Sequence, residues 1–284
     1  MLFIGGKKMA SVQIRCVDIA KKLGCDYILG QRILGQCDLE EICDRYAVFV
    51  CVKPSLAPGQ LKTLARKGRV IWDIIDSPPP EDHVDTYLAS TQLAKEVFKN
   101  YGRIVVVPHH HCNFNGAPNP PDLRQPGWIG GKHWRPRFYG LDCDYYDVDG
   151  LSQAEVVKIL HKIGIGLNYR KNRPSHYPAK YRKLMHDFHI AINSGIKLIN
   201  CIGFGTPSIS ADEPAYHEIG EKCTIISGVK KCAYWVHALQ NDRQFYAQLR
   251  KECTRRSGVF SIDAISLRYQ RLFETGPAPN CGAG

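Results

Sequence analysis

The chain has 284 residues, of which 44% are hydrophobic and 23% charged, and this ordinary globular composition excludes a wholly disordered protein. The length suits two domains of about 100–150 residues each. The net charge is +11, and no stretch approaches the ~20 consecutive apolar residues that a bilayer-spanning helix needs.

The N-terminal sequence, MLFIGGKKMAS, lacks the long apolar core and the small-residue cleavage site of a secretory signal. It is predicted to form a first strand that enters a Gly-Gly turn. The 12 cysteines are spread through predicted helices and strands, and they contain no C-x-x-C pair. This distribution favours reduced, buried thiols and a cytoplasmic protein.

The first hundred residues alternate between short apolar runs and helical patterns. The run Ala47–Lys53 (AVFVCVK) is almost continuously apolar and rich in valine, as a buried parallel strand should be. Strands are predicted at 2–4, 27–29, 47–53, 70–75 and 103–107, and helices at 11–23, 38–45, 58–67 and 90–101. This βαβ alternation predicts an α/β fold with a parallel, doubly wound sheet.

Residues 112–126 (CNFNGAPNPPDLRQP) are rich in Pro, Asn and Gly and mark a linker between domains. A second α/β unit follows, with strands predicted at 128–129, 137–141, 163–168, 208–210 and 224–226 and helices at 152–162, 197–202, 231–239, 242–256 and 262–273. The predicted organisation is an N-terminal domain (1–111), the linker (112–126), a C-terminal domain (127–261), a terminal helix (262–274) and a tail (275–284).

The most informative stretch is Lys197–Glu218, KLINCIGFGTPSISADEPAYHE. It predicts a helix, a Gly-x-Pro break, a short buried strand and a second helix that carries a glutamate. In an open α/β sheet, ligands bind at the carboxyl ends of the strands. A lysine and a glutamate beside such a crevice suit a ligand with a diphosphate and a ribose. The lysine neutralises phosphate, and the carboxylate accepts hydrogen bonds from the ribose hydroxyls. A plain helix–strand–helix unit is the alternative.

The pattern K-L-x-N-x-x-x-x-G-x-P-S-I, with a glutamate eleven residues after the proline, resembles the donor-binding half of GT-B glycosyltransferases of the bacterial group 1 type. The resemblance extends over residues 48–273. It implies two Rossmann-like domains that face a cleft, with the terminal helix crossing back to the N-terminal domain. It also implies transfer of a sugar, as in polysaccharide biosynthesis, from a nucleoside-diphosphate sugar to a hydroxyl of a glycan, lipid-linked or small-molecule acceptor.

The resemblance also assigns a donor site. The segment WIGGKHW is similar to the first loop of the GT-B donor domain, where glycines let backbone amides approach an anion. The donor-binding residues that it implies are Gly130, Gly131, Lys132, Arg135, Lys197, Asn200 and Glu218. Many retaining members carry two glutamates eight positions apart, but Ile192 and Asn200 occupy those positions here. Whether transfer retains or inverts configuration therefore stays open.

In the N-terminal half, Lys53, Asp73 and Asp76 fall at or near the carboxyl ends of predicted strands, where they should line the crevice. The candidates for acceptor activation or sugar orientation are Asp76, His83 and His109, and the further cleft residues are Lys53, Asp73 and His110. The alternative for Asp76 is that it caps a turn before the following prolines.

Two metal motifs are disfavoured by their geometry or context. The run His109–Cys112 offers four ligands in a row, but adjacent side chains point in different directions, and one tetrahedral zinc site does not accommodate them all. The D-x-D triplet Asp142–Asp144 lies outside a GT-A-like context. GT-B chemistry implies no required metal or other cofactor, because lysine, arginine and helix N-termini stabilise the leaving diphosphate.

Much of the positive charge lies between Lys158 and Lys197, where nine basic residues and one acid give a net charge of +8. The segment is either a solvated surface, a diphosphate site, or a contact with an anionic membrane at which the protein would be peripheral. Nucleic acid is not expected as a partner, because no nucleic-acid-binding motif accompanies the charge. A non-catalytic nucleotide- or glycan-binding module and a basic polyanion-binding protein remain alternatives to the enzyme.

Overall fold

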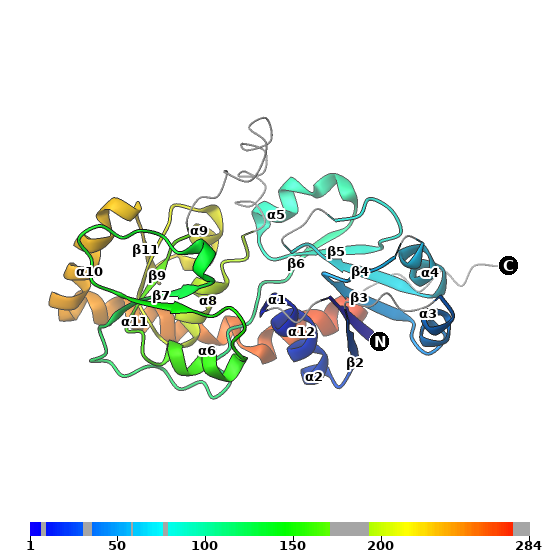
Figure 1. Ribbon diagram of the computed structural model, residues 1–284, viewed down its shortest axis with the longest axis horizontal. Helices are drawn as coiled ribbons and strands as arrows, with labels where there is room; N and C mark the ends of the chain where they lie inside the picture. Colours follow the sequence, from blue (N-terminus) through cyan, green and yellow to red (C-terminus); the bar gives the residue numbers. More distant parts are fainter. Residues whose placement is uncertain (7–9, 31–35, 58, 76–78, 171–192, 275–284) are drawn as a thin grey trace. The chain divides into compact units, whose positions relative to one another are not determined.

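The structure is a computed structural model of the chain, and it describes residues 1–6, 10–30, 36–57, 59–75, 79–170 and 193–274 (Figure 1). Two compact units are present. Unit 1 contains Met1–Pro108 and Ile262–Gly284, and unit 2 contains His109–Ser261. The predicted catalytic residue Asp76, most of the predicted basic segment (171–192) and the predicted tail (275–284) lie outside the described residues.

Unit 1 contains a six-stranded sheet in the order β2-β1-β3-β4-β5-β6, in which every neighbouring pair is parallel. Its strands are β1 (Leu2–Gly5), β2 (Asp26–Leu29), β3 (Val48–Val52), β4 (Arg69–Asp73), β5 (Thr86–Ala89) and β6 (Ile104–Val106). Its helices are α1 (Ala10–Val12), a π-helical turn (Gln13–Asp18), α2 (Ile19–Leu23), α3 (Gln36–Cys43), α4 (Gln60–Lys67), α5 (Gln92–Val97) and α12 (Ile262–Glu274).

Successive residues of the inner strands face opposite sides of this sheet, and both sides are covered. Val50 and Val52 of β3 pack in the cluster that includes Tyr269 of α12, whereas Phe49 and Cys51 face the cluster that includes α3 and α4. This double coverage explains why the sequence of β3 is apolar throughout instead of alternating. It also places α12, the last described helix, in the core of unit 1.

A buried ion pair lies at the carboxyl end of β4. Arg15, from the π-helical turn, donates through Nε to Asp73 Oδ2 at 2.5 Å and through Nη1 to the carbonyl oxygen of Val107 at 2.6 Å. Burial acts to lower the pKa of Arg15, but the carboxylate of Asp73 outweighs it, so the pKa lies above its ordinary value. Asp73, a predicted cleft residue, is therefore a buried partner of Arg15, and its side chain is inaccessible to solvent.

Unit 2 contains a five-stranded parallel sheet in the order β11-β10-β9-β7-β8 (Figure 1). Its strands are β7 (Pro126–Gly130), β8 (Asp144–Asp147), β9 (Ile165–Asn168), β10 (Ser208–Ser210) and β11 (Thr224–Ile226). Its helices are α6 (Gln153–Leu160), α8 (Ile196–Gly203), α9 (Pro214–Gly220), α10 (Cys232–Asn241) and α11 (Arg243–Ser257). The two parallel sheets with flanking helices confirm the predicted fold class of two Rossmann-like α/β domains.

Helix α8 approaches the sheet of unit 2 closely because β9 has a glycine beneath it. A Cβ atom at Gly166 would lie 2.3 Å from the Sγ atom of Cys201, so a larger residue would push α8 away from the strand. The apolar side of α8, including Leu198 and Ile202, is fully buried with residues of α9 and α11. The strand and the helix together fix the position of Lys197 at the start of α8.

Several predicted elements match, and some do not. The strands at 208–210 and 224–226 are confirmed to the residue. The predicted strand at 137–141 is wrong: that segment is irregular after Pro136, with Gly140 at φ 62°, and the edge strand is β8 instead. The four-residue strand β5 was not predicted. The helix that follows it is capped by Thr91 and not by Ser90: the Thr91 hydroxyl accepts a hydrogen bond from the backbone amide of Ala94. The ten cysteines whose side chains are described (Cys16, Cys25, Cys43, Cys51, Cys112, Cys143, Cys201, Cys223, Cys232 and Cys253) are free thiols.

Replacing Asp73 by alanine is expected to destabilise the protein by about 3–5 kcal/mol, because Arg15 would remain as an uncompensated buried charge. Urea denaturation measures this change in the free energy of unfolding. The matched control is Asp44→Ala, which removes an exposed ion pair with Lys67 and should cost much less, because solvent screens exposed pairs. Equal costs for the two substitutions would contradict the structural role of Asp73.

Candidate functional site

The sheet of unit 2 has a topological switch point between β7 and β9. The chain runs from β7 to β8 on one side, crosses back to β9 on the other side and continues outward to β10 and β11. Loops from neighbouring strands diverge at such a point, and a crevice forms outside the carboxyl ends of the strands. Gly130 ends β7 and Asn168 ends β9, so the segments that follow these residues border the crevice.

Lys197 lies at this switch point. Its Nζ atom donates to the carbonyl oxygen of Tyr169 at 3.1 Å and lies 4.4 Å from the ring centroid of Trp128. A Cβ atom at Gly130 would lie only 3.1 Å from the same Nζ atom, so glycine leaves the ammonium group next to the β7 backbone. Burial, followed by repulsion from Arg170, lowers the pKa of Lys197 to about 7.

A second cation, Arg170, follows β9. Its Nη2 and Nε atoms donate to the two carboxylate oxygens of Glu213 at 2.9 and 3.3 Å, a bidentate arrangement that fixes the plane of the guanidinium group. Glu213 also accepts from Nδ2 of Asn193 at 2.5 Å. Glu213 is the residue that precedes α9, so this ion pair links the carboxyl end of β9 to the start of α9.

The glycine-rich loop after β7 carries acidic as well as basic neighbours. The backbone amide of Lys132 donates to Asp147 Oδ1 at 3.2 Å, and a Cβ atom at Gly131 would lie 2.5 Å from Asp149 Oδ1. The guanidinium of Arg135 lies 3.5 Å from the ring centroid of Tyr145. Lys132, Arg135 and Asp149 are exposed, so an anion at this loop would have to displace the Asp149 carboxylate from above Gly131.

Two other predicted donor residues have different surroundings. The Oδ1 atom of Asn200 accepts a hydrogen bond from the backbone amide of Cys112 at 3.0 Å, which ties the segment before β7 to α8. Glu218 lies on the exposed side of α9. The structure thus brings Lys197 together with Gly130, whereas the carboxylate bound to Arg170 belongs to Glu213 and not to Glu218.

The predicted residues of unit 1 lie in separate places. Lys53 follows β3 with φ 47°, and its carbonyl oxygen is so near Gly6 that a Cβ atom there would lie 2.0 Å from it. Since the chain order reverses between β1 and β3, Lys53 borders a switch point of the first sheet. His83 is exposed and has φ 67°. Asp73 is paired with Arg15 in the core.

The histidine run at the start of unit 2 is buried: His109, His110 and His111 are 1–4% exposed. His110 Nδ1 lies 2.9 Å from the carbonyl oxygen of His111, and His111 Nε2 lies 3.2 Å from that of Ser257. Burial lowers the pKa of His111 to about 4, so this imidazole is neutral at physiological pH. Within the described residues, no three His, Cys, Asp or Glu side chains are arranged to hold a metal ion.

Arg170 and Glu213 are the site residues that sequence reasoning missed. Arg170 stands two residues after an inner strand, a position at the carboxyl edge of the sheet that was itself a usable signal. Glu213 comes directly before α9, and its pairing with a residue 43 positions earlier has no local signature.

None of the helices in the described ranges is long and apolar enough to cross a bilayer. No protein-family model matches the chain, and no curated protein matches its sequence.

Comparison with solved structures finds similar folds at low sequence identity. HepE of Anabaena in complex with UDP-glucose is 11% identical, with a TM-score of 0.63 over 97% of this chain and 100% of that one. A glycosyltransferase of Rickettsia africae is 10% identical, with a TM-score of 0.62 over 96% and 97% of the two chains. Sucrose-phosphate synthase of Thermosynechococcus elongatus is 11% identical, with a TM-score of 0.55 over 88% and 83%. The resemblance predicted from the sequence is confirmed for the fold: the chain has the two-domain, Rossmann-like GT-B architecture of these glycosyltransferases.

Proposed function

We propose that this protein is a glycosyltransferase that transfers a sugar from a nucleoside-diphosphate sugar to a hydroxyl acceptor. The observation that carries the proposal is the position of Lys197, whose ammonium group lies at the β7/β9 switch point beside Gly130. The fold supports it, because HepE was crystallised with UDP and with UDP-glucose. Uridine diphosphate is therefore the first nucleotide to test.

The diphosphate would bind between the glycine-rich loop and the start of α8. Lys197 would neutralise one phosphate, and the amides of Gly130, next to Lys197 Nζ, and Gly131 are proposed to donate to another. Arg170 lies within electrostatic reach of Lys197, but its charge is balanced by the bidentate Glu213, so Lys197 is the cation proposed to bind the phosphate. When the bond to the sugar breaks, negative charge grows on the leaving diphosphate, and a cation already fixed in place stabilises it without reorganising.

The remaining roles follow from the predicted residues. Glu218 is proposed to accept hydrogen bonds from the ribose, with Lys132, Arg135 and Asn200 completing the donor site. Acceptor activation or sugar orientation is proposed for Asp76, His83 and His109, and Lys53 and His110 would contact the acceptor or the sugar, which requires His109 and His110, 2% and 1% exposed in the free protein, to become accessible. A base of this kind removes the proton of the acceptor hydroxyl as the new glycosidic bond forms. The acceptor is proposed to be a glycan, a lipid-linked sugar or a small molecule.

Uridine diphosphate at a hundred times its dissociation constant is expected to stabilise the protein by about 2.7 kcal/mol. Lys197→Ala should abolish this stabilisation, because it removes the positive charge at the switch point. Differential scanning fluorimetry measures the change in melting temperature. Lys158→Ala, which removes an exposed lysine from α6 of the same unit, is the control and should keep the full shift. An unchanged shift in Lys197→Ala would refute the donor site.

The affinity for UDP-glucose should fall as the pH rises above about 7. The pKa of Lys197 is lowered to about 7 by burial and by Arg170, so above that pH the free protein must take up a proton before it holds phosphate. The dissociation constant should then increase by up to about tenfold per pH unit. Titration calorimetry at pH 6.5, 7.5 and 8.5 measures it. Lys197→Arg stays protonated throughout this range and should bind without the pH dependence; a flat profile for the unaltered protein would contradict the account.

A further inference from the structure

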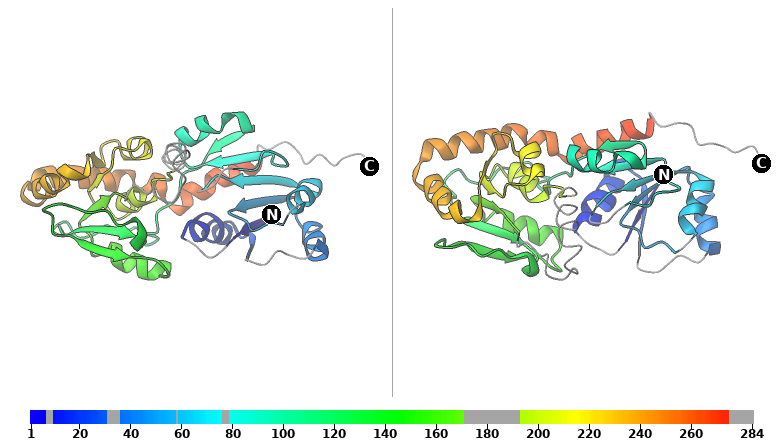
Figure 2. Two further views of the ribbon diagram at one scale, coloured as in Figure 1. Left: turned by 45° about the horizontal axis from the view of Figure 1, so that its top comes forward. Right: turned by 90° about the horizontal axis from the view of Figure 1, so that it is seen from above.

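A second recess lies beside the amino ends of the unit 2 strands, whereas Lys197 lies beside their carboxyl ends. It is a groove of about 450 Å³ between α11 and the segment that leads into β7. The hydroxyl of Tyr246, a groove residue, donates to the carbonyl oxygens of Leu123 at 2.8 Å and Gly164 at 3.0 Å. These residues precede β7 and β9, so the groove lies at the amino ends of the strands. Helix α11, drawn in orange in Figure 2, forms one of its walls.

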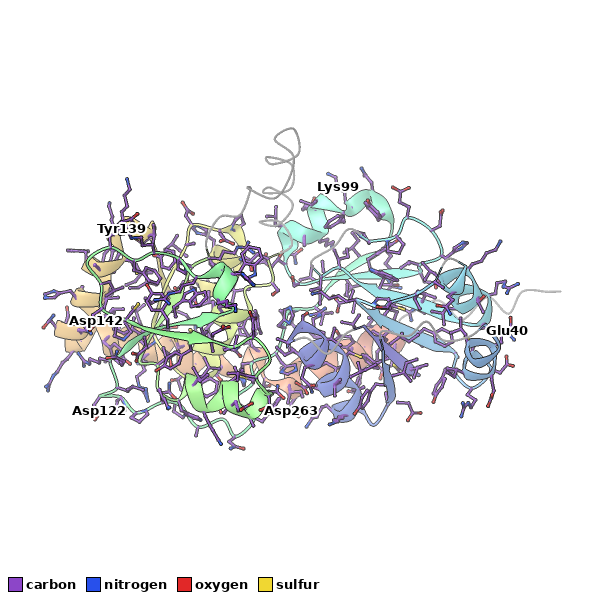
Figure 3. The ribbon with its side chains drawn as sticks, viewed as in Figure 1. Glu40, Lys99, Asp122, Tyr139, Asp142 and Asp263 are labelled. Atoms are coloured by element: carbon purple, nitrogen blue, oxygen red, sulfur yellow. The ribbon has the colours of Figure 1, made fainter. Side chains whose placement is uncertain are left out.

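Positive charge dominates this groove. Four of its eight lining residues are cations: Arg124 comes from the segment before β7, and Arg243, Arg250 and Lys251 come from α11. Arg243 and Arg250 are seven residues apart on the helix, which places them about 10 Å apart along one face. Within the described ranges, none of the four forms an ion pair. Acids lie near the groove as well: Asp122 (labelled in Figure 3) interacts with Tyr246, and Glu252 interacts with the neighbouring Lys251.

Two of the four cations are held in place before any ligand arrives. Arg124 donates through Nη1 to the carbonyl oxygen of Gln240 at 2.8 Å, and its guanidinium lies 4.7 Å from the ring centroid of Tyr246. Arg250 donates through Nη1 to the carbonyl oxygen of Asn119 at 2.8 Å. In both guanidinium groups, Nε and Nη2 donate to no acceptor in the described part of the chain. A fixed guanidinium with two unused donors can bind one oxyanion through two parallel hydrogen bonds.

We propose that this groove is a second binding site, for a soluble ligand that carries phosphate groups. Arginine binds phosphate through two parallel N–H donors, and the groove volume falls within the range of about 300–1,000 Å³ that small-molecule sites occupy. The recess favours a soluble phosphate compound over the flat surface of a bilayer. The inference does not depend on the proposed glycosyl transfer, because the groove and the donor site lie beside opposite ends of the strands of one sheet.

The test uses inorganic tripolyphosphate and titration calorimetry on full-length Lys197→Ala, in which the donor site is disabled. One molecule of tripolyphosphate should bind. Adding Arg243→Ala and Lys251→Ala should weaken binding about tenfold or more, because each exposed side chain supplies a charge-assisted bond and makes no hydrogen bond within the described residues. Circular dichroism melting checks that this variant folds.

The matched control adds Lys230→Ala and Lys231→Ala, which remove two exposed cations outside the groove and should change the dissociation constant less than twofold. Equal weakening by both pairs would overturn the proposal, because binding would then depend on net charge alone. Absence of tripolyphosphate binding to Lys197→Ala would overturn it as well. If the protein sedimented with phosphatidylglycerol vesicles in a way that required Arg243 and Lys251, but did not bind tripolyphosphate, the proposal would also be overturned, because the groove would then bind a membrane surface.

Discussion

The carbonyl oxygen of Tyr169 is the interaction on which the arrangement of the candidate site depends. It accepts from the indole nitrogen of Trp128 at 2.8 Å and from the ammonium group of Lys197 at 3.1 Å, so one acceptor at the end of β9 joins β7 to α8. Gly166 makes this possible because it lets α8 lie against the strand. The switch point, the lysine and the glycine backbone of β7 are therefore positioned by a single local network.

The electrostatics of the site favour an anionic ligand. Lys197 is largely desolvated and is repelled by Arg170, and both effects lower its pKa. Glu213 neutralises Arg170 and keeps its guanidinium in one plane. An arriving diphosphate would restore the charge of Lys197, and it would replace part of the lost solvation of this side chain. In the free protein the charge of Lys197 is weakened and that of Arg170 is balanced by Glu213, and the proposed phosphate ligand would stabilise the protonated lysine.

The sequence was sufficient for the overall architecture and for part of the site. Buried inner strands such as β3 and β10 carry apolar or small residues and are bounded by turn residues, so their positions follow from local pattern. The edge strand β8, with the sequence DYYD, has no such pattern and was missed. Lys197 and Gly130 were both assigned to diphosphate from sequence, and the structure brings them together. Asp73 looked like a cleft residue because it ends a strand, and its partner Arg15, 58 positions away, cannot be identified from spacing.

A crystal structure of the protein grown with uridine diphosphate tests the central claim most directly. The account predicts a diphosphate with an oxygen within hydrogen-bonding distance of Lys197 Nζ, and with further oxygens facing the amides of Gly130 and Gly131. It also predicts that the Asp149 carboxylate has moved away from Gly131. A nucleotide bound elsewhere, with Lys197 still donating only to Tyr169, would contradict the assignment of the donor site.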